Sequence, residues 1–106
     1  MTADVVYQND DVIAIKDIHP QAPVHVLLIP KRHISELTAL ADDDAVLMGR
    51  VVAASREVAK ILGLEYKGFR LIINQGEDGG QIVPHVHVHM LGGAHLGPKI
   101  VHPKDS

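Results

Sequence analysis

The sequence predicts an α+β domain, built as an antiparallel sheet of about five strands with one long helix on one face. Short runs of β-favouring residues alternate with brief turn segments, which is typical of strands joined by short, mostly antiparallel connections. One long segment carries apolar residues at steps of three and four, the period of a helix that is buried on one face. With 106 residues, 46% of them hydrophobic, the chain fits a single domain.

Five runs are predicted to be strands. They cover residues 4–8, 12–16, 24–29, 68–74 and 83–91. The first two flank Asn9-Asp10-Asp11, which favours a hairpin turn. Pro30 is expected to stop the third, because proline has no amide hydrogen to donate to a sheet. The connection from residue 31 to residue 41 is expected to contain one helical turn.

The helix is predicted to begin at Asp42-Asp43-Asp44, where a carboxylate cap suits the positive end of a helix. Gly63 is placed to end it in a left-handed conformation. The three aspartates could instead form a metal cluster, but the capping interpretation is favoured because a helix starts there. The predicted buried stripe consists of Leu47, Val51, Ala54, Val58 and Ile61.

Charge and composition exclude several classes of function. The formal net charge of −3 and the pI near 6.2 do not favour binding to a nucleic-acid backbone, which needs a concentrated basic face. The absence of cysteine excludes disulfides and thiolate metal sites. The start of the chain lacks the features of a signal peptide, and no run approaches the roughly 20 apolar residues of a membrane helix. A cytoplasmic protein without nucleic-acid or membrane partners is therefore expected.

Histidine is unusually frequent, and five of the eight histidines lie in the last 22 positions. They are His85, His87, His89, His95 and His102. Because alternate side chains of a strand share a face, the three histidines from 85 to 89 are expected to point one way. Val86, Val88 and Met90 then point the other way and can pack against the helix. The two histidines of the tail are expected to be exposed.

The row of three imidazoles supports two kinds of chemistry. As metal ligands, His85 and His89 are poorly spaced, because about 13 Å separates their Cα atoms in a strand and a tetrahedral site does not span that distance well. A further ligand would have to come from elsewhere, such as His33 or His25. A neutral imidazole, with a pKa of about 6.5, is a good nucleophile near neutral pH when an acceptor fixes its tautomer. The spacing favours a central nucleophile with a helper on each side, and metal binding stays open.

The segment His85-Val86-His87-Val88-His89-Met90-Leu91 resembles the His-φ-His-φ-His-φ-φ signature of the histidine-triad (HIT) superfamily, where φ is an apolar residue. Further blocks are similar to the Hint branch of this superfamily and follow in the same order: residues 17–25, residues 29–34, Asn74, Gly79-Gly80-Gln81 and Gly92-Gly93. The resemblance spans roughly residues 5–102. It implies that the whole chain, 1–106, is a single HIT domain in which residues 94–106 form an irregular tail.

The resemblance implies an enzyme that hydrolyses the P–N bond of purine nucleoside 5′-phosphoramidates, which are conjugates of AMP, through a nucleotidyl-histidine intermediate. His87 would be the nucleophile, the carbonyl of His85 would orient its ring, and His89 would contact the phosphate or the leaving group. The implied substrate contacts are Asp17 at the ribose, Ile18 at the base, Asn74, Gly80, Gln81 and Ile82 around the phosphate, and His33 in support of the triad. The family implies no cofactor and no metal, and its homodimers join two sheets edge to edge.

Two positions depart from the family pattern and keep other functions open. Ile82 replaces a position that is often polar in relatives, which removes a proton donor. Pro84 is reminiscent of the Fhit branch, whose members cleave dinucleoside polyphosphates. The alternatives are therefore a dinucleoside polyphosphate hydrolase, or a non-catalytic protein that binds a nucleotide or a metal. His25, which lies in an apolar strand, is expected to be a structural histidine, and Lys31-Arg32 to be a solvated pair.

Overall fold

A computed structural model of the protein describes residues 4–98. The elements are β1 (Val5–Gln8), β2 (Val12–Lys16), β3 (Val24–Pro30), a 3-10 turn (Leu37–Ala39), α1 (Asp44–Leu62), β4 (Phe69–Ile72) and β5 (Val88–Gly92). The strands form one five-stranded sheet in the order β1-β2-β3-β5-β4, and every neighbouring pair is antiparallel. The predicted fold class, with its single long helix and its turn between β3 and α1, is confirmed.

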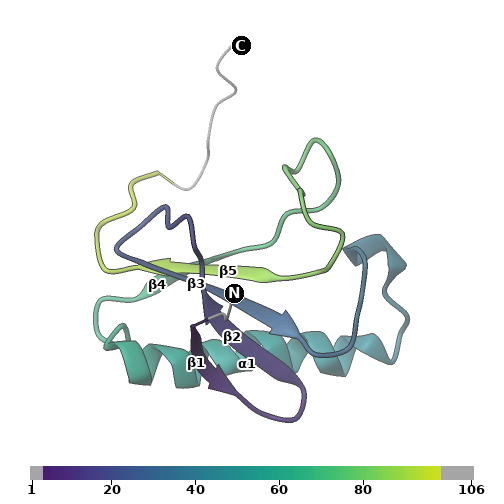
Figure 1. Cartoon of the computed structure of the whole chain (residues 1–106), viewed down its shortest axis with the longest axis horizontal. Coiled ribbons are helices and arrows are strands. Elements are labelled where there is room, and N and C mark those ends of the chain that lie inside the picture. Colours follow the sequence, from purple (N-terminus) through teal and green to yellow (C-terminus); the bar gives the residue numbers. More distant parts are fainter. Residues whose placement is uncertain (1–3, 99–106) are drawn as a thin grey trace.

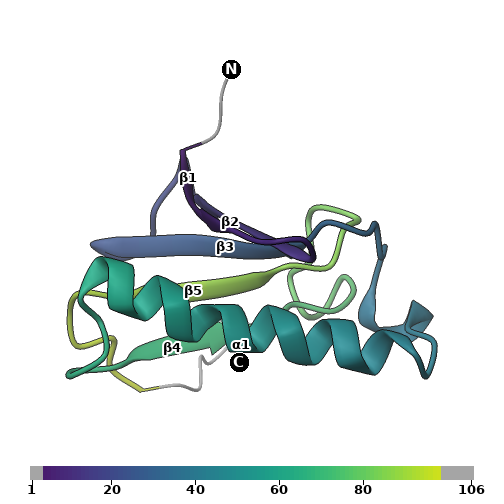
Figure 2. The ribbon, with the colours of Figure 1, turned by 90° about the horizontal axis from the view of Figure 1, so that it is seen from below.

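The sheet separates the molecule into two sides. α1 covers one face, whereas the loops that follow β2, β4 and β5 rise from the other face (Figure 1). The turned view shows α1 lying along the sheet over much of its length (Figure 2). Aliphatic burial between these two layers is the main source of stability for a chain with two tyrosines, one phenylalanine and no tryptophan. The buried cluster consists of Val12, Ala14, Val26, Leu28, Val51, Ala54, Val58, Ala59, Leu64, Val88 and Met90.

The segment that leads into β5 contributes side chains to both faces of the sheet, because successive side chains of an extended chain point in opposite directions. Val86, Val88 and Met90 are 3%, 0% and 0% exposed, as the sequence predicts for the apolar set. Met90 pairs with Val26 of β3 and with Leu71 of β4, so three apolar side chains meet beneath the helix. The histidines that alternate with these positions are only partly buried, and alternation places them on the face opposite α1.

The last strand begins five residues later than predicted. Pro84 has no amide hydrogen, and the amide of Val86 donates to the carbonyl of Ile34 (2.6 Å) instead of to a neighbouring strand. Two of the three histidines therefore precede β5, although burial still alternates through them. β4 is also shorter than the predicted strand 68–74.

The start of α1 differs from the predicted carboxylate cap. Asp43 occupies the N-cap position and makes no hydrogen bond with its side chain. Asp44 is 3% exposed, accepts the amide hydrogen of Ala41 (2.9 Å) and forms an ion pair with Arg32. The buried carboxylate thus ties the chain after β3 to the start of the helix. Lys31 and Arg32 are both exposed, as the sequence predicts, and the arginine in addition forms this ion pair.

The rest of the helix follows its sequence pattern with one exception. Gly63 has a φ of 70° and ends the helix in the left-handed conformation, as predicted. The prediction that Ile61 belongs to the buried stripe is wrong, because Ile61 is 54% exposed and Ala59 is buried in the core instead.

The end of the described chain is irregular. Residues 94–98 contain no helix or strand, and His95 is exposed, as the sequence predicts. The remainder of the predicted tail, with His102, lies outside the described residues. Within residues 4–98, no helix is both long enough and apolar enough to cross a membrane.

Candidate active site

His87 is oriented by the backbone of its own segment. Its Nδ1 lies 2.8 Å from the carbonyl oxygen of His85. A carbonyl can only accept a hydrogen bond, so Nδ1 carries the proton of the neutral ring. Nε2 then keeps a free lone pair, and the structure gives it no hydrogen-bond partner among residues 4–98. This is the contact that the family resemblance implies for a nucleophilic imidazole.

His85 is held by a second backbone carbonyl. Its Nε2 lies 3.2 Å from the carbonyl oxygen of Pro30, the last residue of β3, so Nε2 carries the ring proton. Its Nδ1 lies 3.2 Å from Nδ1 of His33 and accepts a hydrogen from that ring. The two rings meet edge to face with 4.7 Å between their centroids. His33 therefore contacts the first member of the triad directly.

His89 is held from the other side by His25. The ring of His25 is buried, and its Nε2 lies 2.9 Å from Nδ1 of His89. Because the amide of Gln21 donates to Nδ1 of His25 (3.0 Å), the proton of the neutral His25 ring must be on Nε2. His89 thus accepts at Nδ1 and carries its own proton on Nε2. The centroid of the His89 ring, which carries this free N–H, is 4.9 Å from the centroid of the His87 ring.

The hydrogen bond from His25 also disfavours a second proton on His89. An extra proton on Nδ1 of His89 would face the Nε2–H of His25, a proton whose position is fixed by the Gln21 amide. Burial lowers the pKa of His89 below its ordinary value of 6.5, the neighbouring His87 and His25 lower it further, and the Asp17 carboxylate acts in the opposite direction. His89 is therefore a neutral hydrogen-bond donor at pH 7.

Asp17, His25 and His89 are the one group within residues 4–98 with the spacing of metal ligands. Their ligand atoms all lie within 4.8 Å of one another, and Oδ2 of Asp17 is 3.4 Å from Nε2 of His25. The hydrogen bonds disfavour a metal ion there. Ligation through Nε2 of His25 would move its proton to Nδ1, where it would face the amide hydrogen of Gln21. The three aspartates before and at the start of α1 form no such group in the described chain.

Gln81 cross-links the loop between β4 and β5. Its side-chain oxygen accepts the amide hydrogen of Gly76 (2.9 Å). Its side-chain nitrogen donates to the carbonyls of Ser35 (3.0 Å) and Val83 (3.2 Å). Both amide hydrogens of the side chain are thereby used inside the protein. The predicted contact of Gln81 with phosphate stays a prediction, and its visible role is to fix the loop.

The other predicted phosphate contacts lie in the same loop. Asn74 donates to the carbonyl of Gly79 (2.6 Å), and Gly80 has a left-handed backbone with a φ of 80°. The amide hydrogen of Ile82 has no hydrogen-bond partner within the described chain, which leaves it available to an anion. The structure shows no hydrogen bond between these residues and the triad. Ile18, next to the carboxylate of Asp17, is 69% exposed and free to contact a ligand.

The part that His25 plays in the site was not predictable from the sequence pattern. The strand pattern predicted a buried structural histidine, and the ring is buried, yet it also fixes the tautomer of His89. The antiparallel register sets Leu91 opposite His25 and so brings His89 diagonally beside it. A single sequence contains no local signal for this register.

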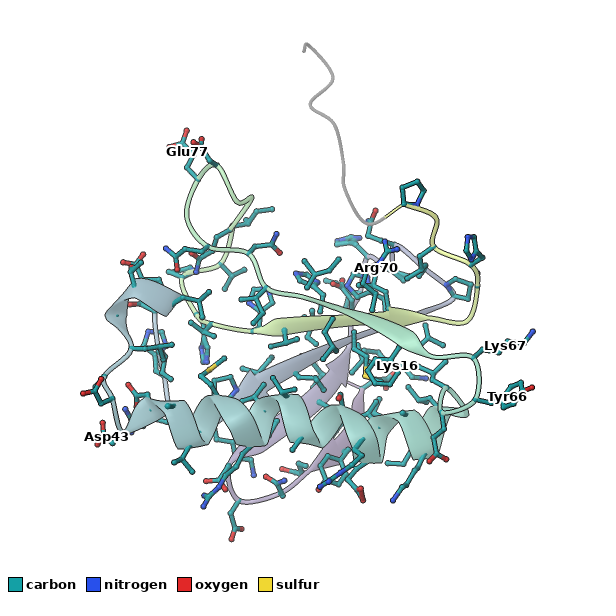
Figure 3. The ribbon with its side chains drawn as sticks, turned by 180° about the vertical axis from the view of Figure 1, so that it is seen from behind. Lys16, Asp43, Tyr66, Lys67, Arg70 and Glu77 are labelled. Atoms are coloured by element: carbon teal, nitrogen blue, oxygen red, sulfur yellow. The ribbon has the colours of Figure 1, made fainter. Side chains whose placement is uncertain are left out.

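A large hollow of the described chain lies away from the triad. It measures about 1120 Å³ and lies where α1 and β5 end and β4 begins, with Tyr66, Phe69 and Arg70 in its lining. Figure 3 shows Tyr66 at the opposite end of the molecule from Glu77, which lies at the tip of the loop cross-linked by Gln81. This hollow contains none of the interacting imidazoles, so the chemistry and not the size of a cavity identifies the candidate active site.

Fold and site together define a class of small α+β proteins in which imidazoles, oriented by backbone groups, line the open face of an antiparallel sheet. The HIT domain model matches residues 1–96, and the chain belongs to the HIT family. It is 41% identical over 100 residues to a purine nucleoside phosphoramidase of Escherichia coli, covering 94% of this chain and 84% of that protein. It is 48% identical over 91 residues to an uncharacterised HIT-like protein of Synechocystis, covering 86% of this chain and 79% of the relative.

Solved structures agree with the family assignment. A HIT family hydrolase from Clostridium thermocellum superposes with a TM-score of 0.90 at 46% identity, covering 95% of this chain and 88% of that one. A histidine triad protein from Clostridium difficile superposes with a TM-score of 0.89 at 37% identity, covering 92% and 85% of the two chains.

Proposed function

We propose that the protein is a hydrolase that cleaves the P–N bond of purine nucleoside 5′-phosphoramidates, conjugates of AMP with an amine. The proposal is carried by one observation: Nδ1 of His87 lies 2.8 Å from the carbonyl oxygen of His85, which leaves Nε2 as a free nucleophile. The likeness to a purine nucleoside phosphoramidase and to HIT family hydrolases supports the reaction class. An enzyme acting on nucleotide conjugates also fits the predicted cytoplasmic location.

In the first step, the lone pair on Nε2 of His87 forms a bond to the phosphorus atom of the substrate. The P–N bond breaks, its electron pair stays on the amine nitrogen, and that nitrogen takes a proton from solvent at the open face of the sheet. The His87 ring becomes a nucleotidyl-imidazolium, and its Nδ1–H bond to the His85 carbonyl strengthens as the ring gains positive charge. The carbonyl thus stabilises the intermediate more than the free enzyme.

In the second step, water attacks the same phosphorus atom. The P–Nε2 electron pair returns to His87, the water loses a proton to solvent, and AMP leaves with the new P–O bond. Nε2–H of His89 donates a hydrogen bond to a phosphoryl oxygen in both steps, because this ring is neutral and its Nδ1 is already occupied by His25. His89 therefore stabilises developing negative charge without giving up its proton.

The nucleotide is proposed to lie between the loop after β2 and the loop before β5. Asp17 accepts the amide hydrogen of His19 (2.8 Å) at Oδ1, yet a carboxylate has about four acceptor sites and can still bind ribose hydroxyls. Ile18 lies against the base. The phosphate is bound by Asn74 and the free amide of Ile82, in a loop shaped by Gly80 and Gln81, whose N–H groups donate within the protein. His33 holds His85 in place.

The test is to measure release of amine and AMP from adenosine 5′-phosphoramidate with the purified protein, His87→Ala and His95→Ala. We expect loss of turnover in His87→Ala and no change in His95→Ala, because His95 is exposed and follows β5, outside the loops that form the site. An alkaline quench followed by intact mass measurement should detect the AMP adduct on the wild-type chain. Undiminished turnover in His87→Ala would contradict the nucleophile assignment.

The same preparations separate the alternative functions. A higher kcat/KM for a dinucleoside polyphosphate than for the phosphoramidate would favour a Fhit-like hydrolase, the alternative that the resemblance at Pro84 leaves open. Retention of AMP without turnover of either substrate would favour a non-catalytic binding protein.

We also propose a homodimer formed through the free edge of β4. Phe69 and Ile72 of this edge strand are 38% and 36% exposed, and an exposed apolar edge favours pairing with another chain. The large hollow beside β4 would then be covered by the partner. Light scattering coupled to gel filtration should give roughly twice the 11.5 kDa of the chain. A monomer at micromolar concentration would contradict the proposal.

A further inference from the structure

Three consecutive apolar residues are exposed immediately before the triad. Ile82 is 92% exposed, Val83 is 53% exposed, and Pro84 is exposed as well. Single exposed apolar residues are ordinary, but an uninterrupted exposed run adds nothing to the core and lowers solubility unless it serves a function. This run therefore calls for an explanation beyond folding.

The run forms one wall of a hollow of about 480 Å³, which is within the size range of small-molecule sites. We call it the loop hollow, and its further lining includes Ser35, Glu36 and Glu77. The side chain of Gln81 bonds to the backbone of both walls, at Ser35 and at Val83, so the hollow is formed before any ligand binds. A preformed hollow loses little entropy on binding.

The loop hollow lies within reach of a group attached to phosphorus at His87. Consecutive Cα atoms are 3.8 Å apart, so the Cα atom of Pro84 is at most about 11 Å from that of His87. In an in-line displacement, the leaving group departs on the side opposite the attacking Nε2, which is away from the sheet. The loop that carries the apolar run rises from the sheet on that side (Figure 1).

The charges of the hollow narrow the choice of occupant. Glu36 and Glu77 line it, and neither forms an ion pair within residues 4–98. The carboxylate of Glu36 accepts only the hydroxyl of Thr38 (3.1 Å) among the contacts of the described chain. Two unpaired carboxylates beside an apolar wall admit neutral or cationic apolar groups and repel anionic ones.

We propose that the loop hollow is the subsite for the amine side of the phosphoramidate, and that it selects apolar amines against amines that carry a carboxylate. This rests on the proposed function and names its substrate class more closely. Ile82 is then a specificity-determining residue, and it contacts the amine through its side chain while its free amide faces the phosphate.

Three AMP conjugates test the proposal: those of ammonia, phenethylamine and phenylalanine. The last two differ only in one carboxylate. We expect kcat/KM for the phenethylamine conjugate to exceed that for the ammonia conjugate by about tenfold or more, which is the effect of a few methylenes in an apolar site. We expect the phenylalanine conjugate to be about two- to fivefold worse than the phenethylamine conjugate, the scale of exposed charge interactions.

Substitutions test which side chains cause these ratios of kcat/KM. Ile82→Ser should bring the phenethylamine-to-ammonia ratio toward one, whereas Ile61→Ser, which changes an isoleucine that is 54% exposed on α1, should leave it unchanged. The double variant Glu36→Gln and Glu77→Gln should remove the penalty on phenylalanine. An unchanged ratio in Ile82→Ser, or equal rates for all three conjugates in the wild type, would overturn the proposal while leaving the phosphoramidase activity in place.

A binding measurement keeps the inference testable if turnover itself is absent. The phenethylamine conjugate is added to His87→Ala labelled at isoleucine and valine methyl groups, and NMR spectra are recorded. We expect the signals of Ile82 and Val83 to shift and the signal of Ile61 to stay. Shifts confined to other positions would place the amine elsewhere and refute the subsite.

Discussion

Replacing His25 by phenylalanine removes the hydrogen bonds of the ring while keeping its shape. Nδ1 of His89 then loses the donor that lies 2.9 Å away, and the amide of Gln21 loses its acceptor at 3.0 Å. Gln21 is exposed, so water can replace the second bond, but the first belongs to a partly buried ring. One unsatisfied group of this kind costs about 1–3 kcal/mol of folding free energy.

The effect on catalysis follows from the same bond. Without His25, either nitrogen of His89 can carry the proton, so the tautomer that presents Nε2–H to phosphate is no longer enforced. A hydrogen bond contributes about 0.5–1.5 kcal/mol net, so kcat/KM should fall about 2–13-fold, less than for complete removal of His89. Since His25 is one of the neighbours that lower the pKa of His89, that pKa should also rise toward its ordinary value of 6.5.

Long-range ¹H–¹⁵N NMR spectra report both quantities, because they distinguish a protonated ring nitrogen from a bare one and follow each ring through a pH titration. In the wild type we expect bare Nδ1 and protonated Nε2 in both His25 and His89. His95→Phe is the matched control and should leave both rings unchanged. A protonated Nδ1 in wild-type His89, or an unchanged or lower pKa of His89 in His25→Phe, would refute the reasoning.

Three further predictions concern stability, each read from urea denaturation. Leu28→Ala should lose about 2–5 kcal/mol because Leu28 is fully buried in the core, and a loss under about 1 kcal/mol would contradict this packing. Asp44→Ala should lose about 1–3 kcal/mol because the amide of Ala41 loses its acceptor, while Arg32 stays half-exposed to water; an unchanged midpoint would rule this out. The folded-state pKa of His89 is lowered, so the unfolded chain binds protons more readily below about pH 6.5 and the wild type should lose stability as the pH falls. His89→Phe should lose less between pH 7 and 5, and parallel curves would speak against the lowered pKa.

Most of the fold was predictable because its signals are local. The alternation around Val88 and Met90 placed one apolar face and one histidine face on the same segment, and Gly63 marked the end of the helix. Pairings between distant segments were not predictable. The contact of Val86 with Ile34, which delays β5, joins two segments far apart in the sequence, and no local pattern records it.

In the site, too, the local contacts were predictable and the contacts between distant segments were not. The three histidines and the carbonyl of His85 belong to one short segment, so the resemblance alone implied their arrangement. The contact between His25 and His89 depends on strand register, and the contact of His85 with Pro30 depends on where β3 ends. Both follow from tertiary structure, which propensity and periodicity do not encode.

The protons of the triad are directed by main-chain atoms: the carbonyls of Pro30 and His85 and, through His25, the amide of Gln21. Apart from Gln21→Pro, which would remove the amide hydrogen, no substitution at Pro30, His85 or Gln21 deletes these three groups, so most point mutations leave this proton arrangement in place. A designer who grafts the histidine row onto another sheet would therefore transfer the residues without their proton arrangement. The unit that must be copied is the path of the backbone.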